Sequence, residues 1–295
     1  MEKIILYYKF VPVGDPEMTR LWQLELCSRL GLRGRIIISR HGINGTLGGP
    51  LKSLRAYKSA MNKTTFFKGI NYKWSEGSAG DFPRLSIKVR DEVVTFNAAD
   101  ELEIGSRGIK SGGHHLKPEQ VHKLVEERGN EVVFFDGRNA YESRVGRFKG
   151  AVTPNIENTR EFIEEIEKPE YDKLKDKPIV TYCTGGIRCE VLTVLMKNRG
   201  FKEVYQIDGG IVKYGEKYGD NGLWEGKCVV FDDRLTVAFS DESKDIGECV
   251  HCAGHTSNYV NCVIKSCNKF VLVCELCADT EYCANCLPAV APVKK

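Results

Sequence analysis

Two cysteines and an arginine stand close together in the stretch TYCTGGIRCE, residues 181–190, which begins at the end of an apolar, strand-like run. A cysteine between a strand and the first turn of a helix experiences the positive end of the helix dipole and several inward-pointing N–H groups, which stabilise a thiolate. Gly185 and Gly186 let the backbone curl inward, and Arg188 can hold an anion above the sulfur. The pattern predicts that Cys183 is a nucleophile in an anion-binding loop.

The remaining residues of this loop have less certain roles. Cys189 lies six positions after Cys183, so a disulfide with it, a resolving thiol and a small buried side chain are the three alternatives. Thr184 and Ile187 complete the loop. The candidates to line its pocket are Thr184, Tyr182 and Tyr214.

A second group of cysteines lies near the end of the chain, where eight occur between residues 249 and 286. In a reducing compartment, close pairs such as C-x-x-C favour metal over disulfides. Eight thiolates would fill two closed tetrahedral sites, so we expect one or two structural Zn²⁺ ions, with an iron–sulfur cluster as the alternative. Sequential and interleaved pairing both fit, and His251 or His255 could replace a thiolate. The candidate ligands are Cys249, Cys252, Cys262, Cys267, Cys274, Cys277, Cys283 and Cys286.

Positive charge is concentrated in the first third of the chain. Residues 1–100 carry 16 Lys+Arg against 9 Asp+Glu, whereas residues 101–295 carry 27 against 31. A basic segment attracts polyanions such as nucleic acid, and ordinary surface charge is the alternative. The candidate RNA contacts lie around a glycine-rich turn and along one face of the next helix: Arg35, Arg40, His41, Asn44, Lys52, Arg55 and Lys58.

Hydrophobic periodicity predicts an α/β protein with two folded domains and a small tail. Residues 1–100 alternate strands and helices in a βαββαβ-like order, compatible with a ferredoxin-like α+β domain that is basic. Residues 101–117, rich in glycine and polar groups, are expected to be a linker in which His114 and His115 are solvated. Residues 229–295 form the Cys-rich, metal-binding tail.

Residues 118–228 alternate strands and helices, which predicts a parallel sheet with ligands at the carboxyl ends of its strands. Asp136 and Cys183 both follow buried strands, so we expect them at that edge of the sheet. The expected strands and helices span residues 118–130, 131–138, 177–183, 189–201 and 203–218.

Several classes of protein are disfavoured by the sequence. The first residues lack the apolar run of a signal peptide, and no stretch approaches the roughly 18 apolar residues that cross a bilayer, so we expect a cytoplasmic protein without membrane contact. The chain has no nicotinamide or flavin motif and no persuasive site for iron held by two histidines and a carboxylate.

The loop CTGGIR, together with VVFFDGRNAYESRVGRFKGAVTPNI and YQIDGGIVKYGEKYG, resembles a rhodanese domain. YCTGGIRCE combined with KFVPVGDPEMTR, GRIIISRHGINGTLGG and the Cys-rich tail resembles, over nearly the whole chain, the rhodanese-like, oxygen-dependent tRNA uridine(34) hydroxylases. The resemblance implies a catalytic Cys183, and a supporting role for Asp136, Arg138 and Glu142. The short loop from Cys183 to Arg188 matches rhodaneses rather than the related phosphatases, whose loop is one residue longer.

The resemblance also implies a reaction, in which molecular oxygen is the co-substrate and the wobble uridine in the anticodon stem-loop of tRNA becomes 5-hydroxyuridine. Our hypothesis is that Cys183 adds to C6 of the uracil ring, while Arg188 and the loop amides stabilise charge on O4. Two other functions compete with this one. The first is a sulfurtransferase that carries a persulfide on Cys183, and the second is a non-catalytic binding module, against which the intact Cys183 and Arg188 argue.

Overall fold

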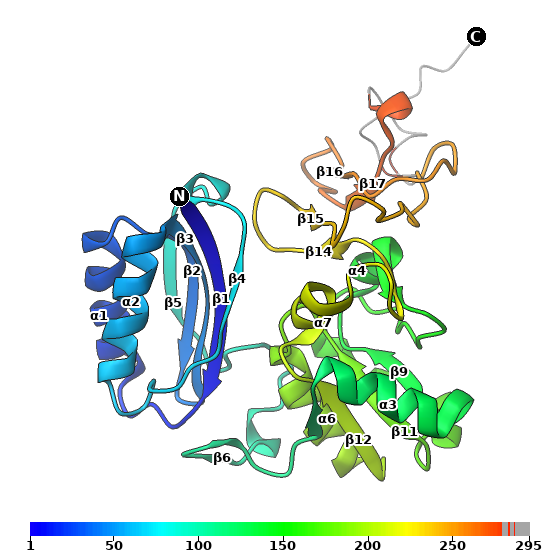
Figure 1. The fold of residues 1–295 in the computed structure, drawn as a ribbon, viewed down its shortest axis with the longest axis horizontal. Helices are drawn as coiled ribbons and strands as arrows, with labels where there is room; N and C mark the ends of the chain where they lie inside the picture. The colour runs from blue at the N-terminus through cyan, green and yellow to red at the C-terminus, as the bar shows by residue number, and fades with distance from the viewer. Residues whose placement is uncertain (279–282, 284–285, 287–295) are drawn as a thin grey trace.

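The computed structural model describes residues 1–278, 283 and 286 of the chain. Figure 1 shows three parts: an N-terminal sheet covered by two helices, a central sheet with helices around it, and a tail of short strands. The open face of the N-terminal sheet is turned toward the central part. No helix within the described residues is long and apolar enough to cross a membrane.

The N-terminal part has the predicted ferredoxin-like order, with one strand more. Its sheet runs β4-β1-β3-β2-β5, in which β5 pairs parallel to β2 and all other pairs are antiparallel. The Asp15 side chain accepts the Met18 N–H at 2.9 Å and so caps the first helix. The elements are β1 Glu2–Phe10, α1 Pro16–Arg29, β2 Arg33–Ser39, β3 Gly42–Pro50, α2 Leu51–Lys63, β4 Tyr72–Ser75 and β5 Leu85–Val89.

Alternation along the strands gives this sheet two different faces. Ile36 and Ile38 of β2 are buried in one core with Leu54 of α2, so both helices cover that face. Arg35 and Ile37, which alternate with them, point to the other face. The open face therefore carries the side chains that meet the central part.

The central part is the predicted parallel sheet, with strand order β8-β12-β11-β9. One core holds Val121 of α3 and Ile211 of α7, while the core on the other side holds Phe162 of α5 and Leu192 of α6. The elements are β8 His114–Leu116, α3 Pro118–Arg128, β9 Val133–Asp136, α4 Ala140–Val145, β10 Gly146–Phe148, α5 Phe162–Ile166, β11 Pro178–Tyr182, α6 Ile187–Asn198, β12 Glu203–Ile207 and α7 Gly210–Tyr218.

Residues 101–117, which we expected to be a linker, are structured. They contain a hairpin of β6 Ile104–Gly105 and β7 Gly108–Ile109, followed by β8, which pairs parallel to β12 at the edge of the central sheet. Upstream, Phe96 already packs against Phe162 of the central core. The central fold thus begins before the helix where the periodicity places it, because two- and three-residue strands leave no pattern in a sequence.

The tail follows β13 Trp224–Gly226, which pairs with β10. It consists of two hairpins, β14 Cys228–Val229 with β15 Thr236–Val237 and β16 Tyr259–Asn261 with β17 Phe270–Leu272. A small core of Val145, Val229, Tyr259 and Leu272 joins the tail to α4. Short 3₁₀ helices lie at Ala79–Asp81, Ala99–Glu101, Gly129–Glu131, Thr159–Glu161, Pro169–Leu174 and Glu275–Cys277.

Candidate active site

Cys183 follows β11 directly and begins the loop that leads into α6, as the sequence predicts. The Gly186 N–H donates to its Sγ at 3.1 Å. The first amides of α7 also hold the loop, since Ile211 N–H donates to the Cys183 carbonyl at 3.0 Å and Val212 N–H to the Thr184 carbonyl at 3.1 Å. Two helix N-termini therefore shape the backbone around the sulfur.

The surroundings of Cys183 favour the thiolate. Burial alone would raise the pKa of this thiol, but hydrogen bonding with Cys189, the charge of Arg188 and the amides of both residues outweigh burial and lower the pKa well below its ordinary value. Burial and the neighbouring Cys183 raise the pKa of the Cys189 thiol instead. Of the two cysteines, Cys183 is thus the one whose thiolate the loop favours, and Cys189 is its buried hydrogen-bond partner.

Arg188 does not extend freely above the sulfur but is held by a carboxylate. Its guanidinium forms a two-pronged ion pair with Glu142, in which Nη2 lies 2.8 Å from Oε2, and the Glu142 side chain is completely buried. Nη2 also donates to the Thr184 hydroxyl at 3.3 Å. Glu142 therefore fixes the arginine against the loop. This contact is how Glu142 could serve the supporting role that we expected for it.

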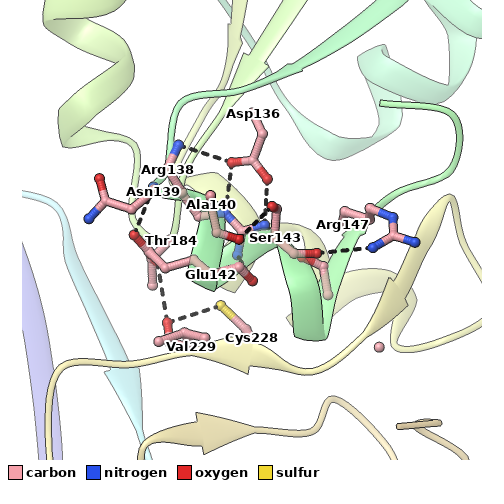
Figure 2. A network of polar contacts seen from close by, with 12 residues as sticks. Asp136, Arg138, Asn139, Ala140, Glu142, Ser143, Arg147, Thr184, Cys228 and Val229 are labelled. Carbon is pink, nitrogen blue, oxygen red and sulfur yellow. Dashed lines mark hydrogen bonds and ion pairs between the residues drawn. The ribbon is translucent and has the colours of Figure 1, made fainter. Parts of the chain in front are cut away.

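A second buried ion pair lies next to the first. The Arg138 guanidinium contacts the Asp136 carboxylate with Nη2 to Oδ2 at 2.6 Å, and neither side chain is exposed to solvent. Arg138 Nη2 also donates to the Gly146 carbonyl at 2.6 Å. Figure 2 shows Asp136, Arg138 and Glu142 side by side, so this network braces the turn between β9 and α4 that carries Glu142.

The open face of the N-terminal sheet presses onto the Cys183 loop. A Cβ at Gly185 would lie 2.6 Å from Leu6 Cδ2, and a Cβ at Gly186 would lie 3.0 Å from the Tyr8 hydroxyl. Gly186 also has a φ of +98°, which side-chain-bearing residues rarely adopt. The two glycines are thus required both by the loop backbone and by the sheet above it.

Between sheet and loop lies a cavity of about 260 Å³, which Cys183 helps to line. Its walls come from segments that lie far apart in the chain, and the lining includes two predicted RNA contacts, Arg35 and Asn44. The Asn139 side chain also lines it, and its buried Oδ1 has no hydrogen-bond partner among the described residues. A cavity of this volume is large enough for a planar ring, and polar side chains line it.

We expect Cys183 to react selectively with iodoacetamide at neutral pH, because its pKa is lowered and the cavity gives access to it. The alkylation rate should fall only when the pH drops through this lowered pKa. Cys27 and Cys228 are internal controls, since burial raises the pKa of each to about 12. Peptide mass spectrometry measures all three; equal labelling of Cys27 and Cys183 would contradict the prediction.

His115 is exposed to solvent, as we expected, and it also belongs to a charged cluster beside the loop. Its Nε2 lies 3.4 Å from Glu190 and its Nδ1 lies 4.0 Å from Asp208. The neighbouring carboxylates of Asp208 and Glu190 raise the pKa of His115 to about 10, which favours its protonated form. Because the Tyr8 hydroxyl donates to Glu190 at 2.9 Å, the cluster also ties the N-terminal sheet to α6.

Lys73 of β4 is a buried cation near the same cluster that the sequence did not single out. Only 3% of it is exposed, and its ammonium lies 4.4 Å from the centre of the Tyr8 ring. Burial lowers the pKa of Lys73 to about 8, while the negative charges of Cys183, Asp208 and Glu190 act in the opposite direction. Lys73 therefore adds positive potential behind the loop.

The other predicted RNA contacts lie elsewhere in the N-terminal part. Arg40 and His41 occupy the turn between β2 and β3, outside the lining of the cavity. Three further candidates lie on α2, which covers the sheet face turned away from Cys183: Lys52, Arg55 and Lys58.

Two of the three expected pocket residues are part of the core instead. Tyr182 and Tyr214 are fully buried with Phe148 and Trp224 behind the loop, whereas Thr184 lines the cavity. Tyr182 is the last residue of β11 and Tyr214 lies on α7, and both rings pack against Phe148. Conversely, nothing in the sequence indicated Phe231, which lines the cavity although it is remote from the loop in the chain.

The tail cysteines gather into two groups of four. Their pairing is interleaved, and neither group includes a histidine. Within each group all sulfur atoms lie within 4.8 Å of one another, with Cys252 Sγ 3.6 Å from Cys274 Sγ and Cys267 Sγ 3.5 Å from Cys283 Sγ. A single tetrahedral ion with Zn–S bonds of about 2.3 Å spaces its ligands by about 3.8 Å, so each group fits one metal ion. The groups are Cys249, Cys252, Cys274 and Cys277, and Cys262, Cys267, Cys283 and Cys286.

Three protein-family models match successive parts of the chain. Residues 2–93 match a "UPF0176 acylphosphatase like domain", residues 117–217 a "Rhodanese-like domain" and residues 225–289 a "Rhodanase C-terminal" region. These matches agree with the three parts of the structure.

Curated relatives match the chain over almost its entire length. A "tRNA uridine(34) hydroxylase" from Corynebacterium urealyticum is 58% identical over 286 residues, which cover 96% of this chain and 96% of the relative. A protein with the same name from Arthrobacter sp. is 55% identical over 289 residues, covering 97% of each chain. The similarity therefore includes the N-terminal sheet and the tail as well as the Cys183 loop.

Proposed function

The chain belongs to the family of the tRNA uridine(34) hydroxylases, and we propose that its cavity above Cys183 receives the wobble uridine of tRNA and converts it to 5-hydroxyuridine. The observation that carries this proposal is the position of Cys183, which lines a cavity of about 260 Å³ together with Arg188 at the start of a helix; its lowered pKa agrees with this role. The wobble base lies in an exposed anticodon loop, so it can enter the cavity without melting a duplex.

Cys183 acts in this proposal as a nucleophile toward the pyrimidine ring. Its sulfur forms a bond to C6, and the electron pair of the C5–C6 double bond moves to C5 and O4 as an enolate. Arg188 and the loop amides stabilise the charge on O4. C5 then bonds to molecular oxygen, the co-substrate; a thiol reductant supplies two electrons and two protons, so that one oxygen atom stays on C5 and the other leaves as water. Loss of the C5 proton and of the sulfur restores the double bond.

The proposed partner is the anticodon stem-loop of tRNA, approached from the open face of the N-terminal sheet. Arg35 and Asn44 support this, because both line the cavity above Cys183. Arg40 and His41 in the adjoining turn, and the cations of α2, stay predictions. The cytoplasm, where tRNA is found, is the proposed location.

The test is nucleoside mass spectrometry of tRNA incubated with the purified protein, dithiothreitol and isotopically labelled oxygen gas. We expect one labelled oxygen atom on uridine at position 34. A gain of sulfur would instead identify a sulfurtransferase with a persulfide on Cys183. An unchanged nucleoside would favour a binding module and contradict the proposal.

We further propose that each tail group holds one structural Zn²⁺. Four thiolates within 4.8 Å favour a single ion over an iron–sulfur cluster, in which the thiolates are carried by separate irons. A closed set of four ligands leaves no position for substrate, so the ion stabilises the tail fold.

Elemental analysis should find two zinc ions per chain and no iron. A Cys274→Ser variant should lose about one of them and expose the tail to proteolysis, because metal binding supplies much of the folding energy of such small segments. A Cys27→Ser variant should keep both ions. Visible absorbance with stoichiometric iron would contradict the zinc assignment.

A further inference from the structure

A long groove leads away from the Cys183 cavity along the open face of the N-terminal sheet. It has a volume of about 650 Å³ and runs between β2 and β5 on one side and the turn that joins β14 to β15, residues 230–235, on the other. Arg35, Ile37 and Phe231 line both the groove and the cavity, so the two spaces adjoin each other. The groove is therefore placed to hold the part of a long ligand that lies next to the group in the cavity.

One wall of the groove is strongly basic. Arg35, Arg84, Lys88 and Arg90 line it, all four are exposed, and none forms an ion pair among the residues that the structure describes. This contrasts with the many paired cations elsewhere, such as Arg128 with Glu131 at 2.9 Å. Unpaired cations in a row are suited to a polyanion, because each phosphate that they neutralise releases a counterion.

Carboxylates also line the groove, but most are already engaged. Asp232 pairs with Arg234, with Nη2 to Oδ2 at 2.6 Å, and the Asp81 carboxylate accepts the Ser78 N–H at 2.6 Å. Asp233 is the remaining acidic group. A neutral N–H leaves the charge of Asp81 in place, so four cations face two carboxylates without a cationic partner in the described part of the chain, Asp81 and Asp233, and the groove is positive.

Phe231 stands where the groove meets the cavity, and 52% of it is exposed. The Arg188 guanidinium lies 5.7 Å from the centre of its ring, which places the ring directly beside the catalytic loop. An exposed phenylalanine costs free energy in water unless a partner covers it, and a base offers a flat apolar face of matching size.

The turn that carries Phe231 is fixed at both ends. The Thr184 hydroxyl donates to the Val229 carbonyl at 3.4 Å, and Cys228 Sγ contacts the same carbonyl at 3.6 Å, as Figure 2 shows. On the other side the Asp233 N–H donates to the Asp81 carbonyl at 3.1 Å. The backbone that carries the ring is thus held in position before any ligand arrives, which reduces the entropy lost on binding.

We propose that this groove binds the single-stranded RNA next to the target uridine. Phe231 stacks on a neighbouring base at the mouth of the cavity, and Arg35, Lys88 and Arg90 contact the phosphates that follow. An aromatic platform beside a row of cations is the chemistry that recognises an unpaired RNA strand. This proposal rests on the proposed function, from which it takes the identity of the polyanion. It adds the surface of the protein that binds the RNA.

The test measures the binding of a fluorescein-labelled RNA anticodon stem-loop by fluorescence anisotropy over a range of salt concentrations. Phe231→Ala should weaken binding about tenfold without changing its salt dependence, and Phe231→Tyr should restore it. A Lys88→Gln, Arg90→Gln double variant should reduce the slope of log K against log salt by about 1.4, the value for two contacts to a single strand.

Lys63→Gln with Lys68→Gln is the matched control, because it removes the same charge from exposed positions that do not line the groove. Cys183 alkylation checks that each variant keeps an intact site. Unchanged stem-loop affinity in both groove variants would overturn the proposal, and so would equal competition by polyglutamate, which carries charge but no bases. If binding follows these expectations while no nucleoside is hydroxylated, the proposal that the groove binds RNA is supported and the proposed function is contradicted.

Discussion

A Cys183→Ser variant is expected to lose 5-hydroxyuridine formation by a factor on the order of 10³ or more. A serine hydroxyl stays protonated at neutral pH, so the features that lower the pKa of the Cys183 thiol cannot generate a comparable nucleophile from it. Nucleoside mass spectrometry of tRNA after a timed incubation measures the rate.

Cys27→Ser serves as the control, since Cys27 is a buried thiol in the N-terminal core with a pKa raised to about 12. It should keep activity even if it loses some stability. Binding of the stem-loop by Cys183→Ser should be unchanged, which separates chemistry from recognition. Full hydroxylation by Cys183→Ser would refute covalent catalysis by this residue.

Removing the carboxylate of Glu142 should have the largest effect on stability. In a Glu142→Ala variant the Arg188 guanidinium, whose side chain is 7% exposed, would lose its two-pronged partner and remain buried with an uncompensated charge. The expected cost is about 3–5 kcal/mol in the free energy of unfolding. Denaturant unfolding followed by circular dichroism measures it.

The matched control is Glu131→Gln, which breaks an exposed ion pair with Arg128. The Glu131 side chain is 66% exposed. Its cost should stay below about 1 kcal/mol, because water screens surface charges. Similar losses in the two variants would show that the Glu142 pair is no stronger than a surface one. Glu142→Ala should also slow alkylation of Cys183, since Arg188 would no longer be fixed beside the sulfur.

Residues that act through local sequence order could be predicted. Cys183 and Arg188 share one loop, and Asp136 ends the neighbouring strand, so strand, turn and helix patterns were enough to bring them to one edge of a parallel sheet. The ferredoxin-like order of the first domain followed in the same way from strand and helix periods.

Residues that meet across long stretches of chain could not be predicted. Tyr8 and Phe231 reach the site from opposite ends of the sequence, and their neighbours give no hint of it. His115 is exposed, as expected, but its carboxylate neighbours, Glu190 and Asp208, could not be predicted because they follow it by more than 70 residues. A residue's local composition reports its helix or strand, not which distant segment covers it.

In the tail, too, contacts between distant segments could not be predicted from the sequence. The eight thiols were predicted as ligands from their spacing, because C-x-x-C knuckles bring two sulfurs to one ion. Which knuckle joins which depends on the path of β16 and β17 between them, so the interleaved partition became visible only in three dimensions.

Protein synthesis makes the parts of this site in a fixed order. Leu6 and Tyr8 leave the ribosome first, Cys183 follows with Arg188 and the earlier Glu142, and Phe231 comes later. A growing chain therefore contains the residues that lower the pKa of Cys183, and the strand that covers it, before it contains the turn of residues 230–235 that lines the cavity.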